Sequence, residues 1–238
     1  MRKSTAAALL GTVAVAALSR SGKRMGRLLR NSGRSQSERI AQKASQRFMM
    51  YFAMPAWAIA GGLDWLWHRQ TKIETTSGPT ESLMHLLMMA ESGTAVLAGL
   101  FLEPNAAMFA IMSTGMLVHQ ATVIWDVHYT VSRRKIPAVE QHTHTFMETL
   151  PFDILAVFAG LYPNEFRSMV NLGPEKPDFS LRLRKPSIPL HHVALIFGAM
   201  TIISALPHVE ELWRCLRAKQ HGLTGTETPD CARALYAD

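Results

Sequence analysis

Apolar and polar residues are strongly segregated along this chain. Polar and basic residues fill 20–47 and 163–187, and long apolar blocks lie between and after them. Most of these blocks approach the roughly 20 residues that a helix needs to cross a bilayer. They are rich in Gly, Ala and Ser, which allow helices to pack closely in lipid. We therefore predict an all-α fold, an integral membrane bundle of about five transmembrane helices, at residues 48–67, 82–102, 105–129, 146–162 and 188–207. The alternative is a soluble helical bundle with buried helices.

The polar regions divide the chain into three parts. Arg2 and Lys3 precede the uncharged run 4–19, which is typical of a signal peptide or a short anchor, with an organellar transit peptide as the alternative. Nine Lys or Arg against one Glu in 20–47 predict contact with anionic lipid headgroups. This run has no interleaved aromatic residues, so we do not expect nucleic-acid binding. The predicted parts are a signal- or anchor-like and basic membrane-surface segment, a transmembrane metal-binding domain and a polar C-terminal tail, at 1–47, 48–213 and 214–238.

Composition adds two constraints. The mean hydropathy of +0.06 resembles that of a soluble protein only because apolar and basic segments average out. The two cysteines, Cys215 and Cys231, form no CxxC, so neither a disulfide framework nor a thiolate metal site is expected.

Histidines and carboxylates gather at the ends of the apolar blocks. Asp64 with His68, and Glu81 with His85, are spaced i, i+4, so each pair shares one face of a helix. Helices that alternate in direction bring these block ends to one end of the bundle. Ionisable groups at membrane depth are costly and usually functional. The predicted metal ligands are Asp64, His68, Glu81, His85, His119, Asp126, His128, Glu140, His142, His144 and Glu148.

Helical geometry orders part of this set. At about 100° per residue, Glu140, His144 and Glu148 form one stripe, and His119 shares a face with Asp126. His128 and His142 fall off these faces, which favours a role in orienting other ligands. Glu81 and Glu140 also have a simpler interpretation as acids in the first turn of a helix. Glu81 or Glu148 is the expected bridging carboxylate.

Imidazole and carboxylate donors without thiolate suit iron, zinc or manganese. We expect two metal ions, with iron first, in a di-iron oxidoreductase that acts on a hydrophobic or lipid substrate and uses a redox partner. The alternatives are a zinc-dependent membrane hydrolase, in which a metal-bound water attacks, and a non-catalytic metal sensor or carrier. The many carboxylates argue against haem. His191 and His192 are expected at the opposite end of the bundle, and His208 at the cluster end.

Several motifs resemble a family of small bacterial multi-pass membrane proteins. They are DWLWHR from Asp64, ETTSG and ES from Glu74 to Ser82, WDVH from Trp125, EQH from Glu140 and EELW from Glu210, within residues 50–215. The resemblance implies a place in the bacterial inner membrane and no established activity. Some members carry a diguanylate cyclase label, but this chain has neither a GGDEF motif nor a Gly-rich phosphate loop. The distribution of basic residues places the cluster on the outer side.

Overall fold

The structure is a computed structural model that describes residues 36–174, 176–183 and 188–226. The predicted signal-like segment, Cys231 and the end of the tail lie outside these residues. The prediction of an all-α fold is confirmed, since the described part of the chain contains helices and no strand longer than the isolated bridge between Leu102 and Leu183. The elements are α2 (Gln36–Phe48), η1 (Met49–Ala53), α3 (Met54–Gln70), η2 (Ile73–Thr75), α4 (Pro79–Phe101), α5 (Ala106–Thr130), α6 (Ala138–Leu161), α7 (Pro163–Met169), α8 (Leu190–Met200), η3 (Thr201–Ala205) and α9 (Leu206–Gln220).

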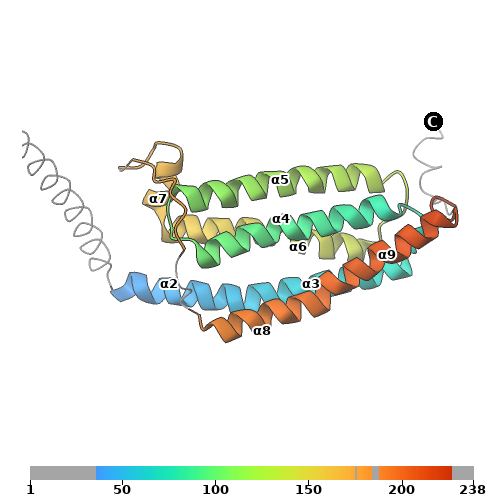
Figure 1. Cartoon of the computed structure of the whole chain (residues 1–238), viewed down its shortest axis with the longest axis horizontal. Helices are drawn as coiled ribbons and strands as arrows, with labels where there is room; N and C mark the ends of the chain where they lie inside the picture. The colour runs from blue at the N-terminus through green and yellow to red at the C-terminus, as the bar shows by residue number, and fades with distance from the viewer. Residues whose placement is uncertain (1–35, 175, 184–187, 227–238) are drawn as a thin grey trace, which may run out of the picture. The chain divides into compact units, whose positions relative to one another are not determined.

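The chain divides into two units at residue 44, and of the first unit the structure describes residues 36–43. The second unit is a bundle in which the long helices alternate in direction (Figure 1). In it α4 packs along α5, α3 packs on α6, and α9 packs on α4. As a result the C-terminal ends of α3, α5 and α9 lie at the same end of the bundle as the N-terminal ends of α4 and α6.

Three helices are long and apolar enough to cross a membrane, and a fourth span exists if a bent pair counts as one. The three are α4, α5 and the continuous helix Leu190–Gln220, and the bent pair is α6 with α7, at 108°. The prediction of about five spans therefore holds only in part. α3 continues from η1 in one helical run, so length does not exclude it, but it carries the polar residues Asp64, His68 and Arg69.

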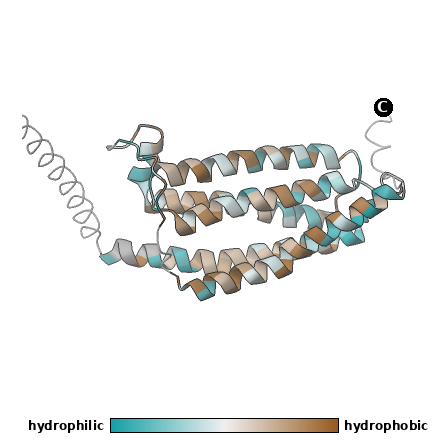
Figure 2. Cartoon of the chain, in the orientation of Figure 1, coloured by the Kyte–Doolittle hydropathy of each residue, from teal (hydrophilic) through white to brown (hydrophobic). Residues whose placement is uncertain are grey.

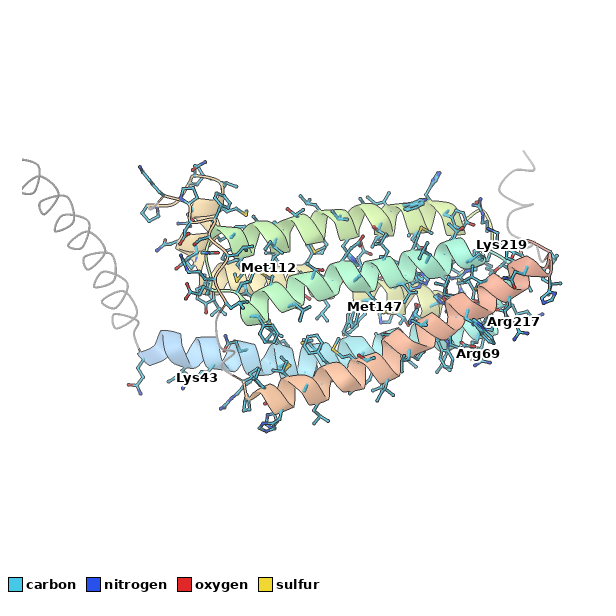
Figure 3. The ribbon with its side chains drawn as sticks, in the orientation of Figure 1. Lys43, Arg69, Met112, Met147, Arg217 and Lys219 are labelled. Atoms are coloured by element: carbon cyan, nitrogen blue, oxygen red, sulfur yellow. The ribbon has the colours of Figure 1, made fainter. Side chains whose placement is uncertain are left out.

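The outer surface of these helices is apolar, which is compatible with an integral membrane protein. Leu117, Ile124, Leu195 and Ile202 are each at least 65% exposed, although such side chains are normally buried in a protein surrounded by water. Figure 2 shows that hydrophobic residues dominate α8 and give way to hydrophilic residues along α9. The basic side chains of Arg69, Arg217 and Lys219 lie at the end of the bundle where α9 ends (Figure 3).

The apolar core lies toward the other end. Met108, Phe109 and Met112 of α5 pack there with Phe158 of α6, and all four are almost fully buried. Gly99 of α4 allows this contact, because a Cβ at that position would lie only 3.0 Å from the Phe158 ring. His192 also lies far from the cluster end, with its Nδ1 2.5 Å from the Tyr51 hydroxyl.

The turn between α3 and α4 is built to start α4 at a fixed place. Gly78 has a positive φ of 71°, which only glycine adopts without strain, and Pro79 occupies the first turn of α4. A side chain at Gly78 would also collide with Thr224, since its Cβ would lie 2.4 Å from Thr224 Cγ2. The Tyr129 hydroxyl donates to the carbonyl of Ser77 at 3.0 Å. These contacts fix Glu81 and His85, which lie in the first two turns of α4.

The helix that ends the bundle contains one π-helical segment, η3, where it crosses α3. Gly61 and Gly62 of α3 face it, and a Cβ on Gly62 would lie 2.9 Å from the carbonyl oxygen of Ile203. Because that neighbour is backbone, it cannot rotate away. Such π segments often occur at functional sites, and here the segment lies directly before His208.

We therefore expect Gly62→Ala to lower the free energy of unfolding by about 1–3 kcal/mol, the usual cost of overpacking. Gly198→Ala is the matched control, because a Cβ there meets nothing within 4 Å and alanine favours a helix. Denaturation of both variants in detergent measures the difference. Equal stability of the two variants would show that α3 and η3 are not in tight contact.

Candidate metal centre

Four imidazoles from four different helices meet near the cluster end of the bundle. His68 and His85 stack with ring centroids 4.6 Å apart, His144 lies 5.7 Å from His85, and His208 lies 6.0 Å from it. Three of the four side chains are at least 95% buried, and that of His144 is 16% exposed. We call these four residues with their neighbouring acids the histidine–carboxylate cluster; the acids are Asp64, Asp126 and Glu211.

Asp64 is the acid that lies close to the largest number of these rings. Its Oδ1 lies 2.7 Å from His144 Nε2, and its Oδ2 lies 3.5 Å from the Nε2 atoms of both His68 and His208. Asp126 Oδ2 lies 3.5 Å from His85 Nε2, and Glu211 lies 2.8 Å from His68 Nδ1 and 3.9 Å from His85 Nδ1. Asp64 therefore lies at the centre of the cluster, within 3.5 Å of three imidazoles.

The hydrogen bonds of two imidazoles determine which nitrogen faces the centre. His208 Nδ1 lies 2.9 Å from the carbonyl oxygen of Ser204, and His68 Nδ1 lies 2.8 Å from Glu211 Oε2. Both oxygens accept only, so each Nδ1 carries the proton, and in the neutral ring Nε2 keeps its lone pair. This arrangement is common around metal-ligating histidines, because it orients the ring and increases its basicity.

The atoms that face the centre are buried and have no hydrogen-bond partner in the structure. A buried polar atom without a partner is costly. Even the close pair His144 Nε2 and Asp64 Oδ1 is not aligned as a hydrogen bond. The unpaired atoms are Asp64 Oδ1, His68 Nε2, both ring nitrogens of His85, Asp126 Oδ1, His144 Nε2 and Glu211 Oε1.

These atoms fit a metal ion. Asp64, His68, His85 and His144 each offer one ligand atom, and the four atoms lie within 4.8 Å of one another. Ligands about 2.0–2.2 Å from a shared ion require only modest closure of such a set. His68, His208 and Glu211 form a second such group, and Glu81, His85 and Asp126 form a third. The cluster could therefore bind a metal ion through imidazole and carboxylate donors.

A buried arginine holds two of the predicted ligands. Arg134, in the turn between α5 and α6, is 2% exposed and donates to both oxygens of Glu81 at 2.5–3.1 Å. It also donates to Glu140 Oε1 and to Thr71 Oγ1. Although burial by itself lowers the pKa of Arg134, the charges and hydrogen bonds of Glu81 and Glu140 raise it above its usual value. We call Arg134, Glu81 and Glu140 the Arg134 ion-pair group.

The structure brings together seven of the eleven predicted ligands in the cluster and this group. The seven are Asp64, His68, Glu81, His85, Asp126, Glu140 and His144. His119 is buried but separate, with Nδ1 3.6 Å from Glu91 Oε2 and 3.4 Å from Ser92 Oγ. Glu148 accepts from Gln120 Nε2 at 2.6 Å. His128 and His142 are exposed and do not join the cluster, because they lie off the inward faces of α5 and α6.

Sequence reasoning missed Arg134 and gave no role to Glu211. Arg134 lies in the basic run Arg133-Arg134-Lys135, which is typical of a solvated loop. The only signal for an ion pair was that Glu81 and Glu140, each in the first turn of its helix, are expected at the same end of the bundle as this turn. The spacing of His208 and Glu211, three residues apart, could have indicated a shared helix face.

A cavity with about 650 Å³ of space, part of it open to the surface, borders the cluster. Asp64, His85, Asp126, His144 and His208 line it, and the remainder of its lining is mainly apolar, with four further polar residues: His119, Gln141, Glu148 and Ser204. Met147, which is labelled in Figure 3, belongs to this lining, as do Trp57, Met88 and Met89. Small molecules that enter the cavity would therefore meet ligand atoms and apolar surface together.

Fold and site together define an all-α, membrane-type helical bundle with a buried histidine–carboxylate cluster. No family model, curated protein or solved structure matches this chain. The resemblance to small bacterial membrane proteins therefore stays a prediction.

Proposed function

We propose that this protein is an integral membrane metalloenzyme that holds two metal ions, iron in the first place, and oxidises a hydrophobic substrate. The ligands we assign are Asp64, His68, His85, Asp126, His144 and His208, with Glu211 available to both His68 and His85. Two-metal sites need about this number of protein ligands. The first hypothesis is an oxygen-dependent oxidase that receives electrons from a redox partner.

One observation carries the proposal: buried carboxylates outnumber buried arginine and lysine residues around the cluster. Five carboxylates are at least 95% buried in the cluster and the ion-pair group, whereas Arg134 is the one buried arginine or lysine that the described residues place there. Buried charges must be paired or must coordinate a metal. Arg134 serves Glu81 and Glu140, so Asp64, Asp126 and Glu211 are left with neutral or titratable partners. Divalent cations would supply the positive charge that otherwise only protonated imidazoles could supply.

The residues of the chain would then have distinct roles. Glu211 and the Ser204 carbonyl hold the protons on His68 Nδ1 and His208 Nδ1, which keeps both Nε2 atoms aimed at Asp64. Trp57 and the methionines of the cavity exclude water. His119 borders the same cavity and can hold a proton at Nε2, which has no partner. When bound, a redox-active metal pair supplies the electrons needed to reduce dioxygen.

The alternative is zinc-dependent hydrolysis of a lipid amide or ester. Four imidazoles suit zinc as well as iron, and the cavity that borders them would admit a water molecule and a substrate. This alternative requires a redox-silent metal and activity without oxygen.

Elemental analysis of the detergent-purified protein, together with its visible spectrum, tests the proposal. We expect about two irons per chain and no haem Soret band. About two zinc ions per chain would favour the hydrolase. A protein expressed in metal-supplemented medium and purified without chelators that contains no metal would overturn the proposal, because the cluster would then be a proton-bonded network.

A further inference from the structure

The cavity beside the cluster continues through the bundle. A second cavity, with about 720 Å³ of space that is partly open to the surface, shares Trp57, Met89 and Ser204 with it, so the two adjoin. A third, with about 460 Å³ of partly open space, shares Met54, Val96 and Ile154 with the second. The three cavities therefore follow one seam along α4, bordered by η1, α3, α6, α8 and η3. We call them the cluster cavity, the middle cavity and the end cavity.

This seam is long and apolar. On α4 it extends from His85 at the cluster to Leu100 at the end cavity, which is about 22 Å at the helical rise per residue. None of the described residues that border the middle and end cavities is charged. Met50, Met54, Ile154 and Phe158 surround the end cavity. Ionisable side chains occur only along the cluster cavity, so the seam suits a long ligand with one polar end.

The space beyond the cluster limits the size of that polar end. Arg134, Glu81 and Glu140 close this side of the bundle, and none is more than 2% exposed. A glycerophosphate headgroup would need room where this ion-pair group lies. A carboxylate would fit, because it could stop at the cluster.

We propose that the seam binds a single unesterified fatty acid, with the carboxylate at the cluster and the hydrocarbon chain in the middle and end cavities. This inference rests on the proposed function, because the metal ions supply the positive charge at the carboxylate end. It makes long-chain fatty acids the substrate class. A long chain fills the middle and end cavities, which a short chain would leave empty, so we expect long chains to bind more tightly than short ones.

Gly93 provides a way to block the seam. It lines the middle cavity, and a Cβ at this position meets nothing within 4 Å. A phenylalanine there can place its ring in the cavity without displacing backbone. Gly198 on α8 is the matched control, because its Cβ also meets nothing, it is exposed, and it borders none of the three cavities.

The test uses the full chain in phosphatidylcholine nanodiscs and palmitic acid with a diazirine at its methyl end. After irradiation, mass spectrometry of the digested protein locates the label. We expect it on Met50, Met54 and Phe158 in the natural protein. Gly93→Phe should reduce this labelling about tenfold, and Gly198→Phe should leave it within about twofold. Excess unlabelled palmitic acid should remove the label, and excess phosphatidylcholine should not.

Labelling that is equal in both variants, or that falls mainly on the exposed Leu195 and Ile202, would overturn the proposal. Displacement by phosphatidylcholine would overturn the assignment to a free acid. If Gly93→Phe does not fold, the position of the label in the natural protein still decides. Metal content is measured on the same preparations. Lost labelling with metal retained therefore concerns the seam, whereas absence of metal from the natural protein concerns the proposed function.

Discussion

Replacing His85 or His144 with alanine is expected to weaken metal binding more than about 100-fold, so that the purified variant contains little metal. His85 contributes a buried ring in which neither nitrogen has a hydrogen-bond partner, and His144 Nε2 lies 2.7 Å from Asp64. Loss of residues that only orient ligands already costs 10–100-fold in metal affinity. Loss of a ligand should therefore cost more. Metal per chain, measured after purification from membranes, checks this expectation.

The chain offers matched controls for both variants. His142 lies two residues before His144 on α6, and His128 lies two residues after Asp126 on α5. Both side chains are exposed and turned away from the cluster. His142→Ala and His128→Ala should keep the full metal content. Undiminished metal in His85→Ala and His144→Ala would show that the cluster is not the binding site.

Arg134→Gln is expected to destabilise the bundle by about 3–5 kcal/mol, the usual cost of removing one partner from a buried ion pair. Glu81 and Glu140 are both 0% exposed, and without the guanidinium their charges would be buried without compensation. Lysine should not restore the loss, because it cannot donate to both oxygens of Glu81 in a fixed planar geometry. The midpoint of denaturation in detergent measures the effect.

Two further variants separate this charge effect from general damage to the turn. Arg133 is next in sequence but exposed, with its guanidinium over the Tyr129 ring. Arg133→Gln should change stability by no more than about 0.5 kcal/mol. Adding Glu81→Gln and Glu140→Gln to Arg134→Gln should recover much of the loss, because no unpaired charge remains. If Arg134→Gln alone is as stable as the natural protein, the ion pair is not buried as described.

The convergence of the site could be predicted because it depends on chain direction alone. Once apolar blocks alternate in direction, the polar ends before and after each turn meet at one end of the bundle. Asp64 and His68 of α3 therefore meet His85 of α4 and His144 of α6, although these helices are separated in the sequence. The i, i+4 spacing also predicted correctly that Asp64 and His68 share a face, since His68 Nε2 lies 3.5 Å from Asp64 Oδ2.

The positions of the other candidate residues could not be predicted fully, because they depend on how deep each residue lies in the bundle and on which side of its helix it lies. His119 shares a face with Asp126 but lies seven residues deeper, which is about 10 Å along the axis. It therefore contacts Glu91 and not the cluster. His128 is about 200° around α5 from Asp126, and it is exposed. Arg134 could not be found from periodicity, because it lies in a turn and its role depends on the side chains around it.

The π-helical segment η3 has a consequence for how the last helix of the bundle can vary. A π turn contains more residues than an α turn, so it shifts the phase between α8 and α9. The outward-facing apolar pattern of α8 and the inward pattern of His208 and Glu211 thus follow two separate periodicities. Substitutions along α8 can therefore accumulate without turning His208 or Glu211 away from the cluster. A one-residue deletion within η3, in contrast, would rotate the whole of α9 by about 100°.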